Sequence, residues 1–231
     1  GAPTTAVQAA GRATHHTLGD GDFGHFARMT GEVTAVQAVL SADDPADQID
    51  RVISEVLHRR LPGYLVVPAD VSEMPIDRRE APLPPAPTVT DPAVADRFRA
   101  VVATRVAEAS TVTVLADILV ARLGAEAELH RVLAEGVPHA TLLWGRRVVD
   151  EDSPAYLGSY LGAASAPRVR DAVEESDLLV MAGVQFTDLT SGFFSQRIDP
   201  SRTIEIRGEH TRVGDEDFRP LSMADALDII A

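Results

Sequence analysis

The stretch HHTLGDGDFGHF, residues 15 to 26, concentrates the side chains of this sequence that could do chemistry. It holds two adjacent histidines and three further titratable residues: His15, His16, Asp20, Asp22 and His25. Histidine donates or accepts a proton near neutral pH, so the histidine pair could act in acid–base catalysis. Carboxylates and imidazole also suit Mg²⁺, Mn²⁺ or Zn²⁺, so the other three residues could form a metal site.

The same stretch also matches the pattern GxGxxG of dinucleotide-binding loops, through Gly19, Gly21 and Gly24. Such a loop must follow a strand, whereas a helix-like segment precedes Gly19. Asp20 and Asp22 would also repel a pyrophosphate bound at this position. Asp and Gly residues crowded together are typical of an ordinary turn, which weakens the dinucleotide and the metal interpretations alike.

A helix is predicted to carry the two histidines. Residues 4–18, TTAVQAAGRATHHTL, are rich in alanine and place Val7, Ala10 and Thr14 at helical spacing, and Gly19 follows where a helix would stop. Neighbouring helical side chains point about 100° apart, so one imidazole could face a cleft while the other braces it. Paired histidines are also common on surfaces and in cores, so the pair alone does not establish catalysis.

Residues 32–70 are predicted to form a strand, a helix and a second strand. Residues 32–40, EVTAVQAVL, have two largely apolar faces and predict a buried strand. Pro45 follows two aspartates that could cap a helix, and apolar residues recur at helical spacing over 49–57, which predicts an amphipathic helix. Residues 63–70, GYLVVPAD, predict a second strand closed by its proline.

Six of the fifteen prolines lie between Pro75 and Pro92, which predicts an extended linker, with a rigid surface loop inside one domain as the alternative. Beyond it a helix begins at Pro92, and strands then alternate with helices. The predicted strands are 111–116, 139–144, 178–183 and 203–207. The predicted helices are 118–135, 167–175 and 223–230. This alternation is typical of an α/β fold with a doubly wound parallel sheet.

Composition excludes several classes of function. The chain has no Cys, which excludes disulfides and thiol nucleophiles, and no Lys, which excludes Schiff-base lysines and P-loops. A net charge of −14 without a basic run disfavours nucleic acid as a partner. The apolar runs are too short to cross a membrane, and no export signal opens the chain, so the cytoplasm is the expected compartment.

Taken in order, several segments resemble the thiamine diphosphate-dependent 2-oxo-acid decarboxylases of the indolepyruvate, phenylpyruvate and pyruvate decarboxylase type. The segments are GAPTTAVQAAGRATHHTLGDGDFGHF, VTAVQAVL, PGYLVVPADV, YLGSYLGAASAPRVRDAVEESD and FTD. The resemblance covers the whole chain but only part of such an enzyme. It implies that residues 1–72 are the C-terminal part of a pyrimidine-binding α/β domain, that 73–105 are a proline-rich linker and connecting helix, and that 106–231 are the central domain.

The resemblance also implies a reaction, non-oxidative decarboxylation of a 2-oxo acid to an aldehyde and CO₂, and a catalytic role for His15 and His16. Thiamine diphosphate and Mg²⁺ are the implied cofactors. The family's GDG signature holds Mg²⁺ through Asp and Asn, and the chain has no Asn, so the GDG at 19–21 is coincidental. The main cofactor-binding residues are therefore expected outside this chain, which alone should be inactive.

The expected partner is a small 2-oxo acid, with assembly as a homodimer or homotetramer in the full-length form. Two other functions stay open at this point. One is a related thiamine diphosphate carboligase, such as an acetolactate synthase-like enzyme, and the other is a non-catalytic α/β binding module.

Overall fold

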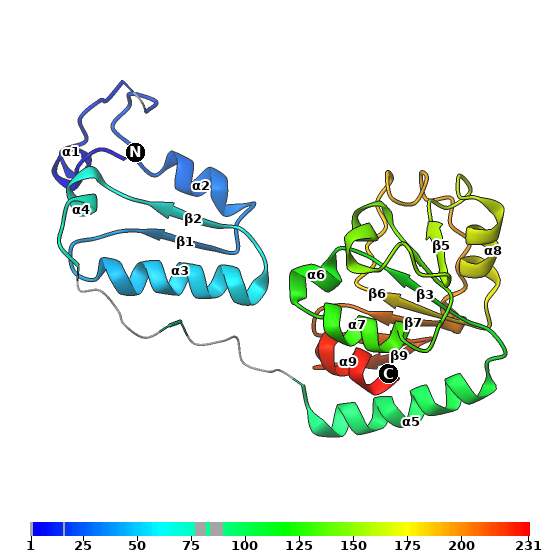
Figure 1. Ribbon diagram of the computed structural model, residues 1–231. Coiled ribbons are helices and arrows are strands. Elements are labelled where there is room, and N and C mark those ends of the chain that lie inside the picture. The colour runs from blue at the N-terminus through cyan, green and yellow to red at the C-terminus, as the bar shows by residue number, and fades with distance from the viewer. Residues whose placement is uncertain (1, 16, 77–81, 84–89) are drawn as a thin grey trace. The chain divides into compact units, whose positions relative to one another are not determined.

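The computed structural model describes residues 2–15, 17–76, 82–83 and 90–231. The chain forms two compact units, Gly1–Pro87 and Thr88–Ala231. Figure 1 shows a small α/β unit at the N-terminus and a larger one that contains the remaining strands.

The first unit is built around two parallel strands, β1 (Val36–Val39) and β2 (Gly63–Val66), joined by helix α3 (Pro45–Arg59). Asp44 caps this helix, because its side chain accepts a hydrogen bond from the backbone N–H of Asp47 at 3.1 Å. The predicted helix and the two predicted strands are confirmed, with shorter strands. A parallel pair requires a crossover of this kind, and α3 supplies it.

The core of this unit is small. Val36, Ala38 and Val52 form its cluster of buried apolar residues, with Val56 and Leu65 packed against them, and Leu40 and Val71 are buried outside this cluster. The predicted apolar stripe of α3 is only partly buried, because Ile53 and Leu57 are exposed to solvent. The helix therefore contacts the sheet through a narrower face than its sequence pattern predicts.

The predicted helix over residues 4–18 is wrong. Helix α1 covers only Thr5–Ala9, and Gly11 then takes a positive φ of 59°, which turns the chain out of the helix. An irregular loop leads to α2 (His25–Gly31), and a further short helix, α4 (Ala69–Ser72), follows β2. His15 consequently lies in a turn and not on a helix.

The second unit contains a seven-stranded sheet in the order β5-β4-β3-β6-β7-β8-β9. The five strands from β5 to β7 are mutually parallel, and β8 and β9 add an antiparallel edge. The bounds are β3 Val112–Ala116, β4 His139–Thr141, β5 Tyr156–Ser159, β6 Leu178–Ala182, β7 Thr203–Ile206, β8 Thr211–Val213 and β9 Glu216–Phe218. The predicted doubly wound parallel sheet is confirmed, and the sequence reasoning missed β5, β8 and β9.

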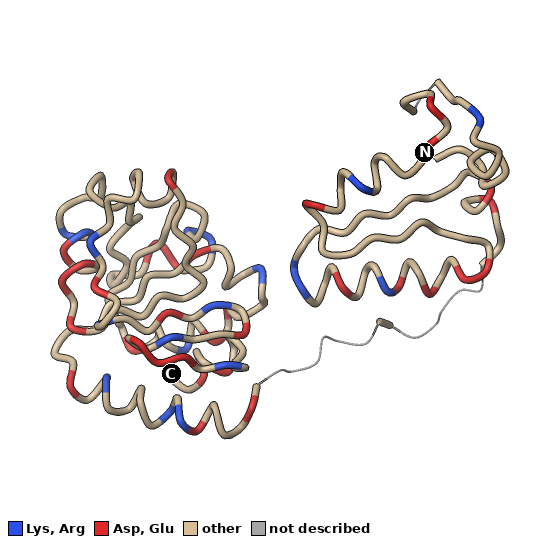
Figure 2. The backbone as a smooth tube through the Cα atoms, turned by 180° about the vertical axis from the view of Figure 1, so that it is seen from behind, with Lys and Arg blue, Asp and Glu red and all other residues tan. Residues whose placement is uncertain are grey.

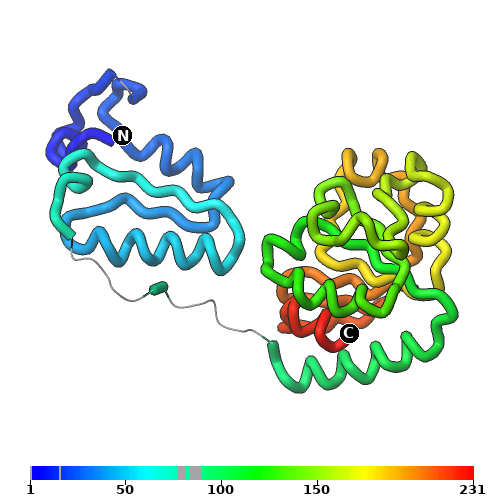
Figure 3. Tube along the Cα trace, viewed as in Figure 1, coloured from blue at the N-terminus to red at the C-terminus, as the bar shows by residue number. Residues whose placement is uncertain are grey.

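Helices cover both faces of this sheet, as Figures 1 and 3 show. Residues of α5, α7 and α9 share one apolar core with the sheet, and α8 contributes to a second core on the opposite face. The helices are α5 Pro92–Glu108, α6 Leu119–Leu123, α7 Glu126–Leu133, α8 Pro167–Glu175 and α9 Met223–Ile230, with short 3₁₀ turns η1 Leu143–Val148 and η2 Pro200–Arg202. This double coverage is what buries the continuous apolar strands β3 and β6.

Two predicted elements of this unit are shorter than expected. The predicted helix over 118–135 is divided into α6 and α7, because Gly124 has a φ of 72° and ends α6 in the left-handed conformation. The predicted strand over 139–144 ends at Thr141, and η1 follows it. The predicted helices that begin at Pro92, Pro167 and Met223 are confirmed.

The start of α5 is fastened to the start of α9. The hydroxyl of Thr90 donates a hydrogen bond to the carboxylate of Asp225 and accepts one from the backbone N–H of Ser222 at 2.9 Å. The backbone N–H of Asp91 donates to the carbonyl oxygen of Pro220 at 3.1 Å. These contacts fix the point at which the chain enters the second unit.

Acidic and basic residues are interleaved along α3 and α5, as Figure 2 shows. Neither of these helices presents a continuous basic face. Among the residues that the structure describes, no helix combines the length and apolar character needed to cross a membrane.

Candidate active site

The loop between α1 and α2 is a compact turn that folds back on itself. A Cβ atom on Gly21, whose φ is 82°, would lie 2.4 Å from the carbonyl oxygen of Gly11, so only glycine fits there. The carboxylates of Asp20 and Asp22 accept hydrogen bonds from the backbone N–H groups of Asp22 and Gly24, at 3.1 and 2.8 Å. The interpretation of this glycine-rich stretch as a turn is confirmed.

The structure brings together the three residues considered as metal ligands, but it pairs them with one another and with an arginine. The imidazole Nε2 of His25 lies 2.7 Å from Oδ2 of Asp20, and a guanidinium nitrogen of Arg28 lies 2.5 Å from Oδ2 of Asp22. The hydrogen bond with His25 lowers the pKa of Asp20, and the hydrogen bond from Arg28 lowers that of Asp22. Within the described part of the chain, no group of three or more ligand residues is placed to hold a metal ion.

His15 lies on the solvent-exposed side of a turn in this loop, and His16 lies outside the described residues. Two threonines close the turn that contains His15. The backbone N–H and the hydroxyl of Thr17 donate to the carbonyl oxygen of Thr14, at 3.2 and 2.9 Å. His15 therefore lies in a hydrogen-bonded turn and not in the helix that was predicted for it.

A carboxylate of α4 ties the N-terminal segment to the first unit. Asp70 accepts hydrogen bonds from the backbone N–H of Thr5 at 2.9 and 3.0 Å and from its hydroxyl at 2.5 Å. Beside this contact, the backbone N–H of Ala69 donates to the carbonyl oxygen of Ala2 at 3.1 Å. The segment before the histidine loop thus runs alongside the end of β2.

We expect Asp70→Asn to loosen this segment, because an amide offers one acceptor oxygen where the carboxylate offers two. Hydrogen exchange of the amides of α1 should become faster, and the Glu73→Gln variant, which alters an exposed carboxylate nearby, should leave it unchanged. The hydrogen bonds from Thr5 lower the pKa of Asp70 from its usual 3.8. A lowered pKa means that the contact stabilises the fold above 3.8 and is lost as pH falls through the lower value. Equal exchange rates in Asp70→Asn and the parent chain would contradict this assignment.

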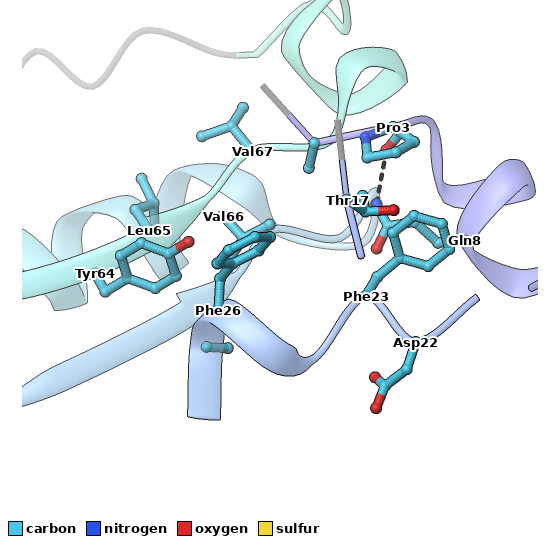
Figure 4. Close-up of a pocket in the computed structure, with 12 residues that line it drawn as sticks. Pro3, Gln8, Thr17, Asp22, Phe23, Phe26, Tyr64, Leu65, Val66 and Val67 are labelled. Atoms are coloured by element: carbon cyan, nitrogen blue, oxygen red, sulfur yellow. Dashed lines mark hydrogen bonds between the residues drawn. The ribbon is translucent and has the colours of Figure 1, made fainter. Parts of the chain in front are cut away.

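A pocket of about 380 Å³ lies beside the histidine loop. Four segments line it: the N-terminal residues, the loop, α2 and the end of β2. Its aromatic lining is formed by Phe23, Phe26 and Tyr64, and Asp22 and Gln8 add polar groups, as Figure 4 shows. The side chain of Gln8 is held by donating to the carbonyl oxygen of Pro3 at 2.7 Å. Such a mixed lining suits a small ligand with an apolar body.

Thr17 connects the pocket to the histidine pair, because it lines the pocket and directly follows His16. The sequence reasoning missed this pocket. Phe23 lies in the turn before α2 and Phe26 in its first turn, and the rest of the lining comes from segments distant in the sequence, so no local signal pointed to the pocket. His15 is not among the described residues that line the pocket, so Thr17 is the link between the pocket and the turn that carries His15.

Comparison with known protein families identifies the family to which the second unit belongs. The family described as "Thiamine pyrophosphate enzyme, central domain" matches residues 100–225, more than half of the chain. The chain therefore belongs to the thiamine pyrophosphate enzymes, and its second unit carries their central domain.

Individual relatives are similar over the whole chain. Alpha-keto-acid decarboxylase of Mycobacterium tuberculosis (strain H37Rv) is 49% identical over 232 residues, which cover 100% of this chain and 41% of that protein. The protein of the same name from Mycobacterium ulcerans (strain Agy99) gives the same identity and coverage. The chain thus spans 41% of the length of these curated relatives.

Among solved structures, the chain is similar to a crystal structure from Mycobacterium smegmatis that is described as a thiamin diphosphate-dependent enzyme. The TM-score is 0.63 at 18% identity, over 100% of this chain and 44% of that one. At this identity the similarity supports the fold alone.

Proposed function

We propose that this chain is part of a thiamine pyrophosphate-dependent decarboxylase that converts a 2-oxo acid of the indolepyruvate, phenylpyruvate or pyruvate type to an aldehyde and CO₂. The observation that carries the proposal is the 49% identity to alpha-keto-acid decarboxylases along the entire chain. On this proposal, residues 1–72 form the C-terminal part of a pyrimidine-binding domain, residues 73–105 connect it, and residues 106–231 form the central domain.

The residues of this chain do not fit the role of holding the cofactor. The chain has no Asn or Lys, and the Asp20 and Asp22 carboxylates are engaged by His25 and Arg28. Thiamine pyrophosphate and Mg²⁺ would therefore be held by residues of the longer enzyme that lie outside this chain.

What this chain would supply is proton handling. In the net reaction the bond between the carboxyl carbon and the carbonyl carbon breaks, CO₂ leaves, and a proton must be delivered to the former carbonyl carbon. We assign that delivery, and contact with the substrate carboxylate, to His15 and His16. The exposed turn that carries His15 and the adjoining aromatic pocket support this assignment, because the pocket could receive the apolar side chain of the substrate.

The test is a product assay on the full-length enzyme that contains this segment. With pyruvate, phenylpyruvate and indolepyruvate as substrates, we expect aldehyde and CO₂ in equal amounts from at least one of the three. The 231-residue chain alone should give no turnover under the same conditions, because it lacks a diphosphate and magnesium site. Formation of acetolactate from pyruvate without free aldehyde, or turnover by the isolated chain, would contradict the proposal.

The longer enzyme is further proposed to assemble as a homodimer or homotetramer. Sedimentation of the full-length protein measures this directly, and a monomer at working concentration would contradict it.

A further inference from the structure

A cavity of about 360 Å³ lies in the second unit beside the first residue of β4, and its described lining shares no residue with the aromatic pocket of the first unit. Three segments line it: the end of α7 with the residue that follows, the start of β4, and the stretch from η1 to β5. This stretch is held against α7, because the imidazole Nε2–H of His130 donates to the carbonyl oxygen of Val148 at 3.0 Å.

The cavity is lined by a buried imidazole with one unpartnered nitrogen. His139 is only 2% exposed, and Nδ1 of its ring lies 2.9 Å from the carbonyl oxygen of Val137. Because a carbonyl oxygen can only accept a hydrogen bond, Nδ1 carries the proton and Nε2 is an acceptor in the neutral ring. No described residue donates a hydrogen bond to this Nε2. An unpartnered buried polar atom is costly, so its retention points to a donor that a ligand supplies.

A guanidinium without a carboxylate partner lines the same cavity. Arg147 is exposed and forms no ion pair with any residue that the structure describes, whereas the adjacent Arg146 contacts Glu151 at 2.6 Å. The planar guanidinium matches a carboxylate through two parallel hydrogen bonds. The hydroxyl oxygen of Ser153 accepts from the backbone N–H of Ala155 at 3.3 Å, which leaves its own proton for a further acceptor. These two side chains together favour a carboxylate on the ligand.

Two further features of the lining restrict the rest of the ligand. Leu133, Ala134 and Val149 form an aliphatic wall, and no phenyl, phenol or indole ring is among the described lining residues. Asp150 also lines the cavity, and its carboxylate would repel a second negative charge on the ligand. A phosphate ester, which carries nearly two negative charges at neutral pH, therefore fits less well than a singly charged carboxylate.

We propose that this cavity binds a 2-hydroxy monocarboxylic acid with a short aliphatic side chain. The carboxylate pairs with Arg147 and Ser153, the hydroxyl donates to Nε2 of His139, and the side chain lies against Leu133 and Val149. A simple carboxylic acid would leave the buried nitrogen unpaired. A 2-oxo acid would do the same, because its carbonyl oxygen cannot donate. The proposal concerns the second unit alone and does not depend on the decarboxylase activity.

Calorimetric titration of the 231-residue chain with 2-hydroxy-4-methylpentanoate tests this proposal, at a pH of about 8 where an ordinary imidazole is neutral. We expect saturable binding. The matched ligand is 4-methylpentanoate, which keeps the carboxylate and the branched chain but has no hydroxyl. It should bind at least about tenfold more weakly, the usual consequence of leaving a buried acceptor unpaired. The corresponding 2-oxo acid should bind no more tightly than 4-methylpentanoate.

Three variants test the contacts from the protein side. Arg147→Gln removes the guanidinium and should weaken the binding of both acids by about tenfold. Arg146→Gln is the matched control, because this neighbouring arginine is exposed, contacts Glu151 and is not among the described lining residues, so the affinity should stay unchanged. His139→Phe keeps a planar ring but removes the acceptor, so the hydroxy acid should lose its advantage over 4-methylpentanoate.

Saturable binding with a preference for the hydroxyl, which His139→Phe abolishes and Arg147→Gln weakens overall, supports the proposal. An absence of saturable binding by the hydroxy acid, equal affinities for the three acids, or equal effects of Arg146→Gln and Arg147→Gln would overturn it. If His139→Phe does not fold, the three acids on the parent chain and the two arginine variants, which alter exposed side chains, still decide the outcome.

Discussion

Replacing His15 or His16 with glutamine in the full-length enzyme is expected to lower kcat by a factor of about 10² to 10⁴, the usual contribution of a positioned acid or base. Glutamine keeps hydrogen-bonding capacity and similar size but cannot take up or release a proton near neutral pH. Steady-state aldehyde release measures the effect. KM should change less than kcat, because the lost interaction belongs to proton transfer more than to binding.

His25→Gln is the matched control, since His25 lies on the same segment but is paired with Asp20 at 2.7 Å. This substitution should disturb the contact between residue 25 and Asp20 and so loosen the loop. The value of kcat should stay within a few-fold of that of the parent enzyme. A large loss in His25→Gln together with near-normal rates for both His15 and His16 variants would contradict the assignment of the catalytic pair.

Phe98→Ala should destabilise the second unit by about 3–5 kcal/mol, the range for truncating a fully buried aromatic residue. Phe98 on α5 is completely buried, and its ring meets that of Phe218 on β9 edge to face, with centroids 5.3 Å apart. Arg97 lies over the other ring, 5.0 Å from its centroid. The substitution would remove the apolar contact that holds α5 on the edge of the sheet.

Urea unfolding followed by Trp144 fluorescence measures this loss, because Trp144 lies in the second unit. Val106→Ala on the same helix is the control. Val106 is 44% exposed, so its truncation should change the free energy of unfolding by no more than about 0.5 kcal/mol. Equal midpoints for the two variants would show that α5 contributes little to the core.

The sequence pattern predicted those elements whose signals are local. Helix α3 carries its own cap in Asp44 and its proline at the first turn, and α8 and α9 likewise begin at a proline or a capping serine. The predicted helix over 4–18 was wrong because Gly11 takes a positive φ and ends the helix despite the alanines before it, while Asp70 holds Thr5 at the start of α1. Tertiary contacts there outweigh propensity.

Strands β5, β8 and β9 were not predicted, because their sequences show no regular alternation of apolar and polar residues. Strand β5 has Gly158 at a φ of 126° and an irregular pairing with β4, and β8 and β9 have only three residues each. Such short strands form because a neighbouring strand supplies the ladder, and no sequence window of their own length contains that information.

In the candidate site, too, features with a local sequence signal could be predicted, and features that depend on tertiary structure could not. The turn at Asp20 and Asp22 could be predicted, because side chains hydrogen-bonding to the backbone within two residues are a local signal. The aromatic pocket could not, because it joins residues near the N-terminus to the end of β2, more than fifty residues away. A crevice that Asp117 and Gln185 line in the second unit could not be predicted either, because it depends on the strand order that brings β3 and β6 together.

The hydrogen bonds of Thr90 with Ser222 and Asp225 hold the start of α5 at the start of α9. The chain enters the second unit beside the first turn of α9, and the eight residues of α9 span only about 12 Å. Thr90 and the end of α9 therefore lie within one short helix of each other. The contacts of Thr90 thus couple the position of the segment before α5 to the start of α9, two places that are 132 residues apart in the sequence.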